Sequence, residues 1–158
     1  MLNVDWILLA DRSRANILHA LPDGLQPFPT IVSLIHGEGR LHPQDRDSDA
    51  AGRIQLQSGA RSATEPHEDR RHVEARVFAK QIVEYLEQAS RDRRFDRLFV
   101  VAPPEFLGVL RETWPHLLHR KIVREVNANL TQLPQAELQT RLAEIVGTVG
   151  AISDVNPT

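Results

Sequence analysis

The stretch "RLFVVA", residues 97–102, indicates the fold class. After Arg97 every position is apolar, and two of the residues are β-branched valines. A strand of this kind is typical of a sheet that other structure covers on both faces. We therefore predict an α/β protein, with this strand in the middle of the sheet and helices packed against it.

Three apolar runs nearer the N-terminus predict antiparallel strands. They are "WILLA" at residues 6–10, "ANILHA" at residues 15–20 and "TIVSLI" at residues 30–35. The polar letters "DRSR" separate the first two runs, and a stretch with Pro and Gly precedes the third, so turns are expected between them. The chain is thus predicted to open with three antiparallel strands.

Helical periodicity follows these strands. Apolar residues recur at helical spacing from Val73 to Ala89, with Thr64 placed to cap the helix and Pro66 in its first turn. Further predicted elements are a loop and short helix at residues 103–114, a half-exposed strand at residues 121–130 and a last helix at residues 133–146.

The order of these elements predicts the topology. Three antiparallel strands followed by right-handed crossovers give a single mixed five-stranded sheet with helices packed on it, in a ribonuclease H-like layout. We expect one domain at residues 1–152 with a long polar loop at residues 37–65, followed by a frayed tail at residues 153–158.

Composition narrows the functional classes. The 158 residues are 41% hydrophobic and 25% charged, as in one globular domain. The net charge of −2 gives no overall attraction to nucleic acid or anionic lipid, so such a partner needs a local basic patch. Without cysteine there are no disulfides or thiolate sites. With no secretory signal and no run of about 18 apolar residues, we predict a cytoplasmic protein without a membrane partner.

The polar loop at residues 37–65 is long for an unstructured connection in a compact domain. Residues 50–64 carry two arginines and no acidic residue, and two further arginines follow at the start of the long helix. The tip of such a loop can hydrogen-bond to phosphates or to a polymer backbone, or the segment can be a solvated loop without a function. The candidate binding residues are Arg53, Gln57, Ser58, Gly59, Arg61, Arg70 and Arg71.

A second candidate site is the crevice beyond the end of the 97–102 strand, because open α/β sheets commonly bind ligands there. Its apolar wall suits packing as well as binding. The candidate wall residues are Asp11, Pro103, Pro104, Phe106, Leu107 and Thr131.

Catalytic sites are less well supported by the residues. A metal-dependent nuclease needs three carboxylates; Asp5 or Asp11 and Glu74 or Glu84 supply two, and only Glu105 lies near the third position. Asp11 closing a turn and Glu74 on a solvated helix face are the simpler interpretations. Four of the seven histidines lie between Ile35 and Val73, but His67 and His72 are five positions apart and would point in different directions on a helix, so a zinc site is not favoured. No nucleophile elbow or phosphate-binding glycine loop occurs. No metal, cofactor or catalytic residue is predicted.

Four segments carry a family resemblance. In chain order "WILLADRSRANIL", "SATEPHEDRRHVEARVFAKQIVEYL", "RFDRLFVVAPPEFLGVLR" and "ANLTQLPQAEL" resemble the bacterial host attachment protein family, named for proteins required for attachment to host cells. The resemblance extends over residues 4–146. The family is similar in turn to the central domain of archaeal and eukaryotic peptide chain release factors and of the ribosome rescue factor Pelota.

The release-factor similarity bears on the polar loop. In release factors the matching insertion carries a Gly-Gly-Gln tip that promotes hydrolysis of peptidyl-tRNA, whereas here the letters "QLQSGAR", residues 55–61, contain one glycine. The mechanism needs glycine backbone freedom to place an amide against the attacking water. The resemblance therefore implies a non-catalytic module that binds the ribosome, tRNA or rRNA, with an indirect effect on host attachment.

Two alternatives stay open. One is a hydrolase that acts on a nucleotide or on peptidyl-tRNA through Asp11, Glu74 and the loop at Pro103. The other is a protein-interaction module that pairs through a sheet edge or the long helix, which includes formation of a homo-oligomer.

Overall fold

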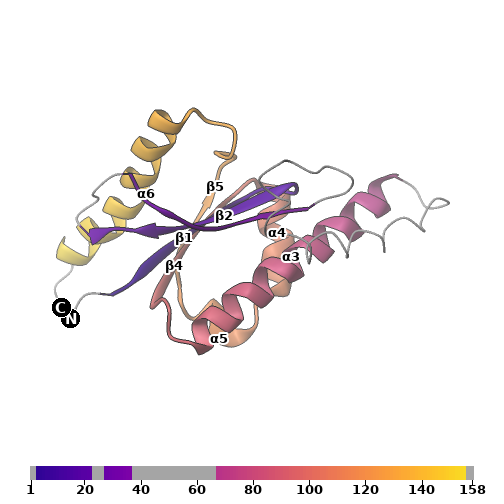
Figure 1. Cartoon of the computed structure of the whole chain (residues 1–158), viewed down its shortest axis with the longest axis horizontal. Helices are drawn as coiled ribbons and strands as arrows, with labels where there is room; N and C mark the ends of the chain where they lie inside the picture. The colour runs from indigo at the N-terminus through magenta and orange to yellow at the C-terminus, as the bar shows by residue number, and fades with distance from the viewer. Residues whose placement is uncertain (1–2, 23–26, 37–66, 156–158) are drawn as a thin grey trace.

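The computed structural model describes residues 3–22, 27–36 and 67–155 of the chain. In this part a single sheet has helices on both faces (Figure 1). The strands are β1 (Asp5–Ala10), β2 (Arg14–Ala20), β3 (Thr30–Ile35), β4 (Arg97–Ala102) and β5 (Ile122–Asn127). The helices are α3 (His67–Arg91), α4 (Pro104–Thr113), α5 (His116–His119) and α6 (Gln135–Val155).

The sheet is mixed, with the strand order β3-β2-β1-β4-β5. β2 is antiparallel to both β1 and β3, and β4 is parallel to both β1 and β5. The α/β class and the mixed five-stranded sheet are thus confirmed. The prediction that β4 is the middle strand is wrong, because β1 holds that position. A strand that is apolar on both faces is expected inside the sheet, but not necessarily at its centre. β4 does lie inside the sheet, between β1 and β5.

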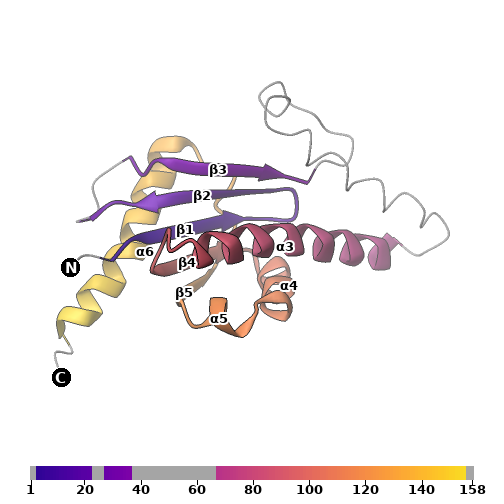
Figure 2. The same ribbon diagram turned by 60° about the horizontal axis from the view of Figure 1, so that its bottom comes forward.

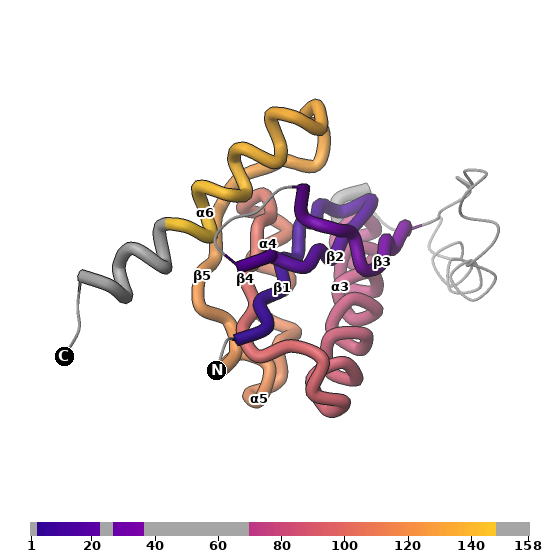
Figure 3. The backbone as a smooth tube through the Cα atoms, turned by 60° about the vertical axis from the view of Figure 1, so that its left-hand side comes forward, coloured from indigo at the N-terminus to yellow at the C-terminus, as the bar shows by residue number. Residues whose placement is uncertain are grey.

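Alternate residues of β1 and β4 enter two separate cores. Leu8 and Val100 belong to the core under α3, α4 and α5, whereas Ile7 and Phe99 belong to the core under α6. Figures 2 and 3 show α3 and α6 on opposite sides of the sheet. Because successive strand residues point to opposite faces, both faces need apolar side chains. This is the physical reason for the continuous apolar letters of these strands.

The strand boundaries follow the predictions closely. β3 and β4 have the predicted bounds, and β1 and β2 each begin one residue earlier than predicted. β5 is shorter than predicted and ends at Asn127. Its pairing with β4 stops there because Asn127 lies opposite Ala102, the last residue of β4.

The helices differ more from the predictions. α6 begins after Pro134 and continues to Val155, past the predicted end at residue 146 and into the predicted tail. The short helix α5 was not predicted, because its four residues are too few to show a period. Thr64 and Pro66, predicted for the start of the long helix, lie outside the described residues.

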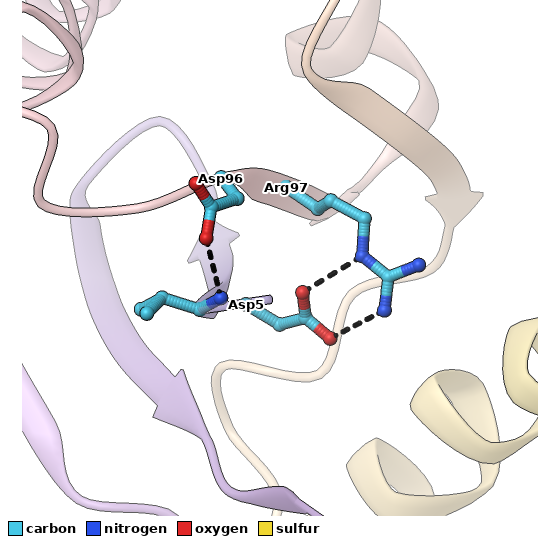
Figure 4. A network of polar contacts seen from close by, with 4 residues as sticks. Asp5, Asp96 and Arg97 are labelled. Carbon is cyan, nitrogen blue, oxygen red and sulfur yellow. Dashed lines mark hydrogen bonds and ion pairs between the residues drawn. The ribbon is translucent and has the colours of Figure 1, made fainter. Parts of the chain in front are cut away.

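A polar clasp joins the N-terminal ends of β1 and β4 (Figure 4). The Nε and Nη2 atoms of Arg97 each lie 2.8 Å from a carboxylate oxygen of Asp5, and Asp96 accepts a hydrogen bond of 2.7 Å from the backbone N–H of Val4. The hydrogen bonding to Asp5 raises the pKa of Arg97 above its ordinary value. The clasp holds two neighbouring parallel strands in register, with Asp5 opposite Arg97.

Candidate functional site

The turn between β1 and β2 is shaped by the side chain of Asp11. Its Oδ1 atom accepts hydrogen bonds from the backbone N–H groups of Ser13 at 2.7 Å and Arg14 at 2.9 Å. The backbone N–H of Asp11 in turn donates to the carbonyl of Arg14 at 2.9 Å. Asp11 therefore closes a turn, as the simpler of its two interpretations predicted.

The other carboxylate oxygen of Asp11 connects this turn to the loop after β5. It accepts a hydrogen bond of 2.5 Å from the hydroxyl of Thr131, which also lies 3.1 Å from Oδ1 of Asn129. A hydroxyl has one proton, so the shorter contact to Asp11 is the bond that Thr131 donates. The structure thus brings together Asp11 and Thr131, both candidates for the crevice wall.

A cavity of about 440 Å³ opens beside this contact, at the carboxyl ends of β1 and β4. Three polypeptide segments form it: the β1–β2 turn, the start of α4 and the loop after β5. The lining residues are Asp11, Arg12, Ser13, Pro103, Pro104, Glu105, Phe106 and Asn129.

The predicted wall residues therefore differ in their roles. Pro103 and Pro104 line the cavity at the start of α4, where Pro103 is the N-cap and lacks a side-chain capping bond. Phe106 also lines it, although the residue is only 1% exposed and its ring lies 6.0 Å from that of Phe78. Leu107 is buried in the core and is not a lining residue. Packing and cavity wall are thus both present, and ligand binding stays a prediction.

A second cavity, of about 510 Å³, adjoins the first along Arg12 and Glu105, which line both. It is lined by the β1–β2 turn, the N-terminal part of α3 and α4. Its remaining lining residues are Arg71, His72, Ala75, Gly108, Val109 and Glu112. We call these two adjoining cavities together the edge cleft.

The arginines near the edge cleft differ in their partners. Arg70 lies 3.6 Å from Glu74 on its own helix, and Glu74 is also 4.0 Å from His36. Arg12 and Arg71 form no ion pair with any residue in the described ranges. Arg12 is half-buried and Arg71 is exposed. The positive charge available to a ligand is therefore on Arg12 and Arg71 rather than on Arg70.

The residues that line the edge cleft differ in part from the site residues predicted from the sequence. The predicted binding residues of the polar loop lie outside the described residues; they are Arg53, Gln57, Ser58, Gly59 and Arg61. Arg12 and Asn129 were not singled out, although each follows the end of a strand that runs in the same direction as β4. Carboxyl ends of parallel strands meet at one edge of a sheet, and this signal could have found both.

Of the carboxylates considered for metal chemistry, Asp11 and Glu105 line the smaller cavity, whereas Asp5 and Glu74 have other partners. Asp5 is paired with Arg97 at the opposite end of β1 from Asp11, and Glu74 is engaged by Arg70 and His36. Among the residues that the structure describes, no group of three or more His, Asp and Glu side chains is arranged to hold a metal ion.

The fold and the edge cleft define an α/β protein with an arginine-bearing, polar cleft at the carboxyl ends of parallel strands. A family model described as "Protein required for attachment to host cells" matches residues 6–142. The chain therefore belongs to this host attachment family. None of the curated proteins matches the chain. Within the described ranges, no helix has the length and apolar character to cross a membrane.

Proposed function

We propose that this member of the host attachment family is a non-catalytic, cytoplasmic, release-factor-like module that binds RNA on the ribosome and affects attachment indirectly. The observation that carries the proposal is the position of the β1–β2 turn, which hydrogen-bonds to His36 and lines one cavity together with Arg71. The backbone N–H of His36, just before the loop, donates to the carbonyl of Ser13 at 2.9 Å. Arg71, just after it, lines the same cavity as Arg12.

This arrangement gathers positive charge from distant parts of the sequence. Arg12 comes from the β1–β2 turn and Arg71 from α3, and both line the larger cavity. Guanidinium groups bind phosphates in a bidentate manner, which suits an RNA backbone. Since the whole chain has a net charge of −2, a local patch of this kind is what RNA binding requires.

The sequence between His36 and Arg71 contains further positive charge. Arg53 and Arg61 occur in a stretch of it without acidic residues. Glu105 and Glu112 also line the cavity, so the attraction is local and depends on where the phosphates lie. A partner with spaced phosphates therefore fits better than a uniformly anionic surface.

The non-catalytic part of the proposal rests on Asp11 and on the loop sequence. The Asp11 carboxylate accepts three hydrogen bonds from the protein, from Ser13, Arg14 and Thr131, so it is committed to holding the turn. The loop lacks the Gly-Gly-Gln letters of the release factors that it resembles.

Co-sedimentation with purified ribosomes tests this function. We expect binding that weakens steeply between about 50 mM and about 200 mM salt. Replacing both Arg12 and Arg71 by alanine should weaken it and lower the salt slope by about 1 per arginine. The matched control replaces Arg120 and Arg141, which are exposed and line neither cavity. Binding that ignores both salt and the Arg12/Arg71 pair would contradict the proposal.

A further inference from the structure

We infer that the edge cleft binds one unstacked nucleotide unit of single-stranded RNA, with its phosphodiester on Arg12 and its base against Pro103 and Pro104. The inference rests on the proposed RNA-binding function and names the unit that is recognised. The smaller cavity, about 440 Å³, falls within the range of roughly 300 to 1,000 Å³ that small-molecule sites occupy.

Arg12 is the reason to expect an anion. The residue is half-buried in the wall that both cavities share, and no described carboxylate pairs with it. Partial burial of an unpaired charge is costly, so an incoming anion relieves that cost. The backbone around Arg12 is held in place, because Asp11 binds the N–H groups of Ser13 and Arg14 and is itself bound by Thr131. A backbone that is already fixed loses less entropy when Arg12 binds a ligand.

Glu105 decides which anion fits. Its carboxylate lines both cavities beside Arg12. A free phosphate or a terminal phosphate monoester carries about −1.5 to −2 charges and is repelled by Glu105 more strongly than a phosphodiester with a single charge. Glu105 also offers an acceptor to a ribose hydroxyl, which is the group that distinguishes RNA from DNA. The pair Arg12 and Glu105 thus favours an internal RNA nucleotide.

Part of the lining of the smaller cavity suits a base. Pro103 and Pro104 present rigid apolar rings without an N–H group, and the buried Phe106 also lines the cavity. Flipped or single-stranded bases are commonly held against apolar and aromatic side chains. Asn129 lies exposed in the lining, and its amide offers both a donor and an acceptor to the edge of a base.

The cleft therefore supplies the three kinds of contact that one nucleotide needs. Arg12 binds the phosphodiester, and Glu105 accepts a hydrogen bond from the ribose. The two prolines and Asn129 contact the base. α4 also begins at Pro104, so the positive end of its dipole lies at the same cavity.

Titration of the full chain with a single-stranded RNA trinucleotide, followed by NMR and calorimetry, tests the inference. The parallel probes are DNA of the same sequence, the free nucleoside and inorganic phosphate. We expect the RNA trinucleotide to bind at least about tenfold more tightly than any of the other three, because each of them lacks at least one of these contacts. Chemical shifts of Ser13 and Asn129 should move with the RNA.

Variants of Arg12 test the anchor. Arg12→Ala should weaken binding of the trinucleotide about tenfold, and Arg12→Lys, which keeps the charge but not the bidentate geometry, should recover only part of it. Arg120→Ala serves as the control, and its affinity should match that of the unaltered chain.

The outcomes separate this inference from the proposed function. Inorganic phosphate binding as tightly as the trinucleotide would overturn it, since that result means an anion site only. Equal affinity for RNA and DNA would overturn the role of Glu105. Co-sedimentation with ribosomes by a chain that does not bind the trinucleotide would leave the function and remove the nucleotide cleft. Trinucleotide binding without co-sedimentation would support the cleft and contradict the ribosomal function.

Discussion

The hydroxyl of Thr131 donates a hydrogen bond of 2.5 Å to the carboxylate of Asp11, which lies 120 positions earlier in the sequence. This contact joins the loop after β5 to the turn after β1, across the intervening strand β4. Because Asp11 also holds the backbone of the turn, the bond from Thr131 connects two of the three segments that form the smaller cavity.

Loss of the Thr131 hydroxyl should destabilise the protein. We expect Thr131→Val to lower the free energy of unfolding by about 1 to 2 kcal/mol, because a hydrogen bond to a charged, half-buried carboxylate is lost. Thr131→Ser keeps the hydroxyl and should lose less stability than Thr131→Val. Urea unfolding followed by circular dichroism measures both, and a valine variant as stable as the serine variant would show that the contact contributes nothing.

The ion pair between Asp5 and Arg97 should also contribute to stability. Both side chains are at least partly buried, with exposed fractions of 13% and 34%, and the geometry is bidentate. We expect Arg97→Ala to cost about 1 to 3 kcal/mol. Arg97→Lys keeps the charge but lacks the planar guanidinium group. Its stability should therefore lie between that of the unaltered chain and that of Arg97→Ala. A lysine variant as stable as the unaltered chain would contradict a role for the bidentate geometry.

The pH dependence of this pair follows from the raised pKa of Arg97. A basic group whose pKa is higher in the folded state stabilises the fold at every pH below its ordinary value, and the contribution is lost only as the pH rises through the folded pKa. The ordinary pKa of an arginine guanidinium lies far above neutral pH, and the hydrogen bonding to Asp5 raises the pKa of Arg97 further. The difference in stability between the unaltered chain and Arg97→Ala should therefore stay constant between about pH 7 and about pH 10. A difference that fades within that range would mean that another group controls the pair.

Gln139 anchors the segment before β3 to α6. Its Oε1 atom accepts a hydrogen bond of 2.8 Å from the backbone N–H of Phe28, and the two residues are 4% and 2% exposed. We expect Gln139→Leu to cost about 1 to 3 kcal/mol, because the buried N–H is left without its acceptor. Thermal unfolding checks this, with the exposed Thr140→Ala as control.

The same Gln139 variant separates stability from binding. α6 covers the opposite face of the sheet from α3 and α4, so Gln139→Leu should leave the affinity for RNA unchanged at temperatures where the chain is folded. A loss of RNA binding in the folded variant would mean that α6 takes part in the site.

Local patterns were sufficient for most of the secondary structure. The continuous apolar letters of β1 and β4 indicated burial on both faces, and Leu8 and Ile7 do enter opposite cores. The incorrect secondary-structure predictions have two different causes. The four residues of α5 show no period, and the end of β5 is set by the last residue of its neighbour, Ala102, rather than by its own letters.

The candidate site was accessible from the sequence only in part. Asp11, Pro103 and Pro104 follow directly after predicted strands, so their place at the sheet edge could be anticipated. The position of Arg12 after a strand end could be read from the sequence, but its partial burial and its lack of a described ion-pair partner depend on surrounding segments. Arg70 illustrates the converse, since its neighbour Glu74 neutralises it on the helix surface.

The amino-acid sequence by itself therefore determined the class of fold, the order of the strands and helices along the chain, and the turn that Asp11 closes, because each depends on residues close together in the chain. Only the tertiary structure decided that Thr131 binds Asp11, that Arg97 meets Asp5 and that Arg12 shares a cavity with Arg71. These pairs depend on which strands become neighbours and in what register. Periodicity shows that a strand is buried, but it does not name the strand beside it.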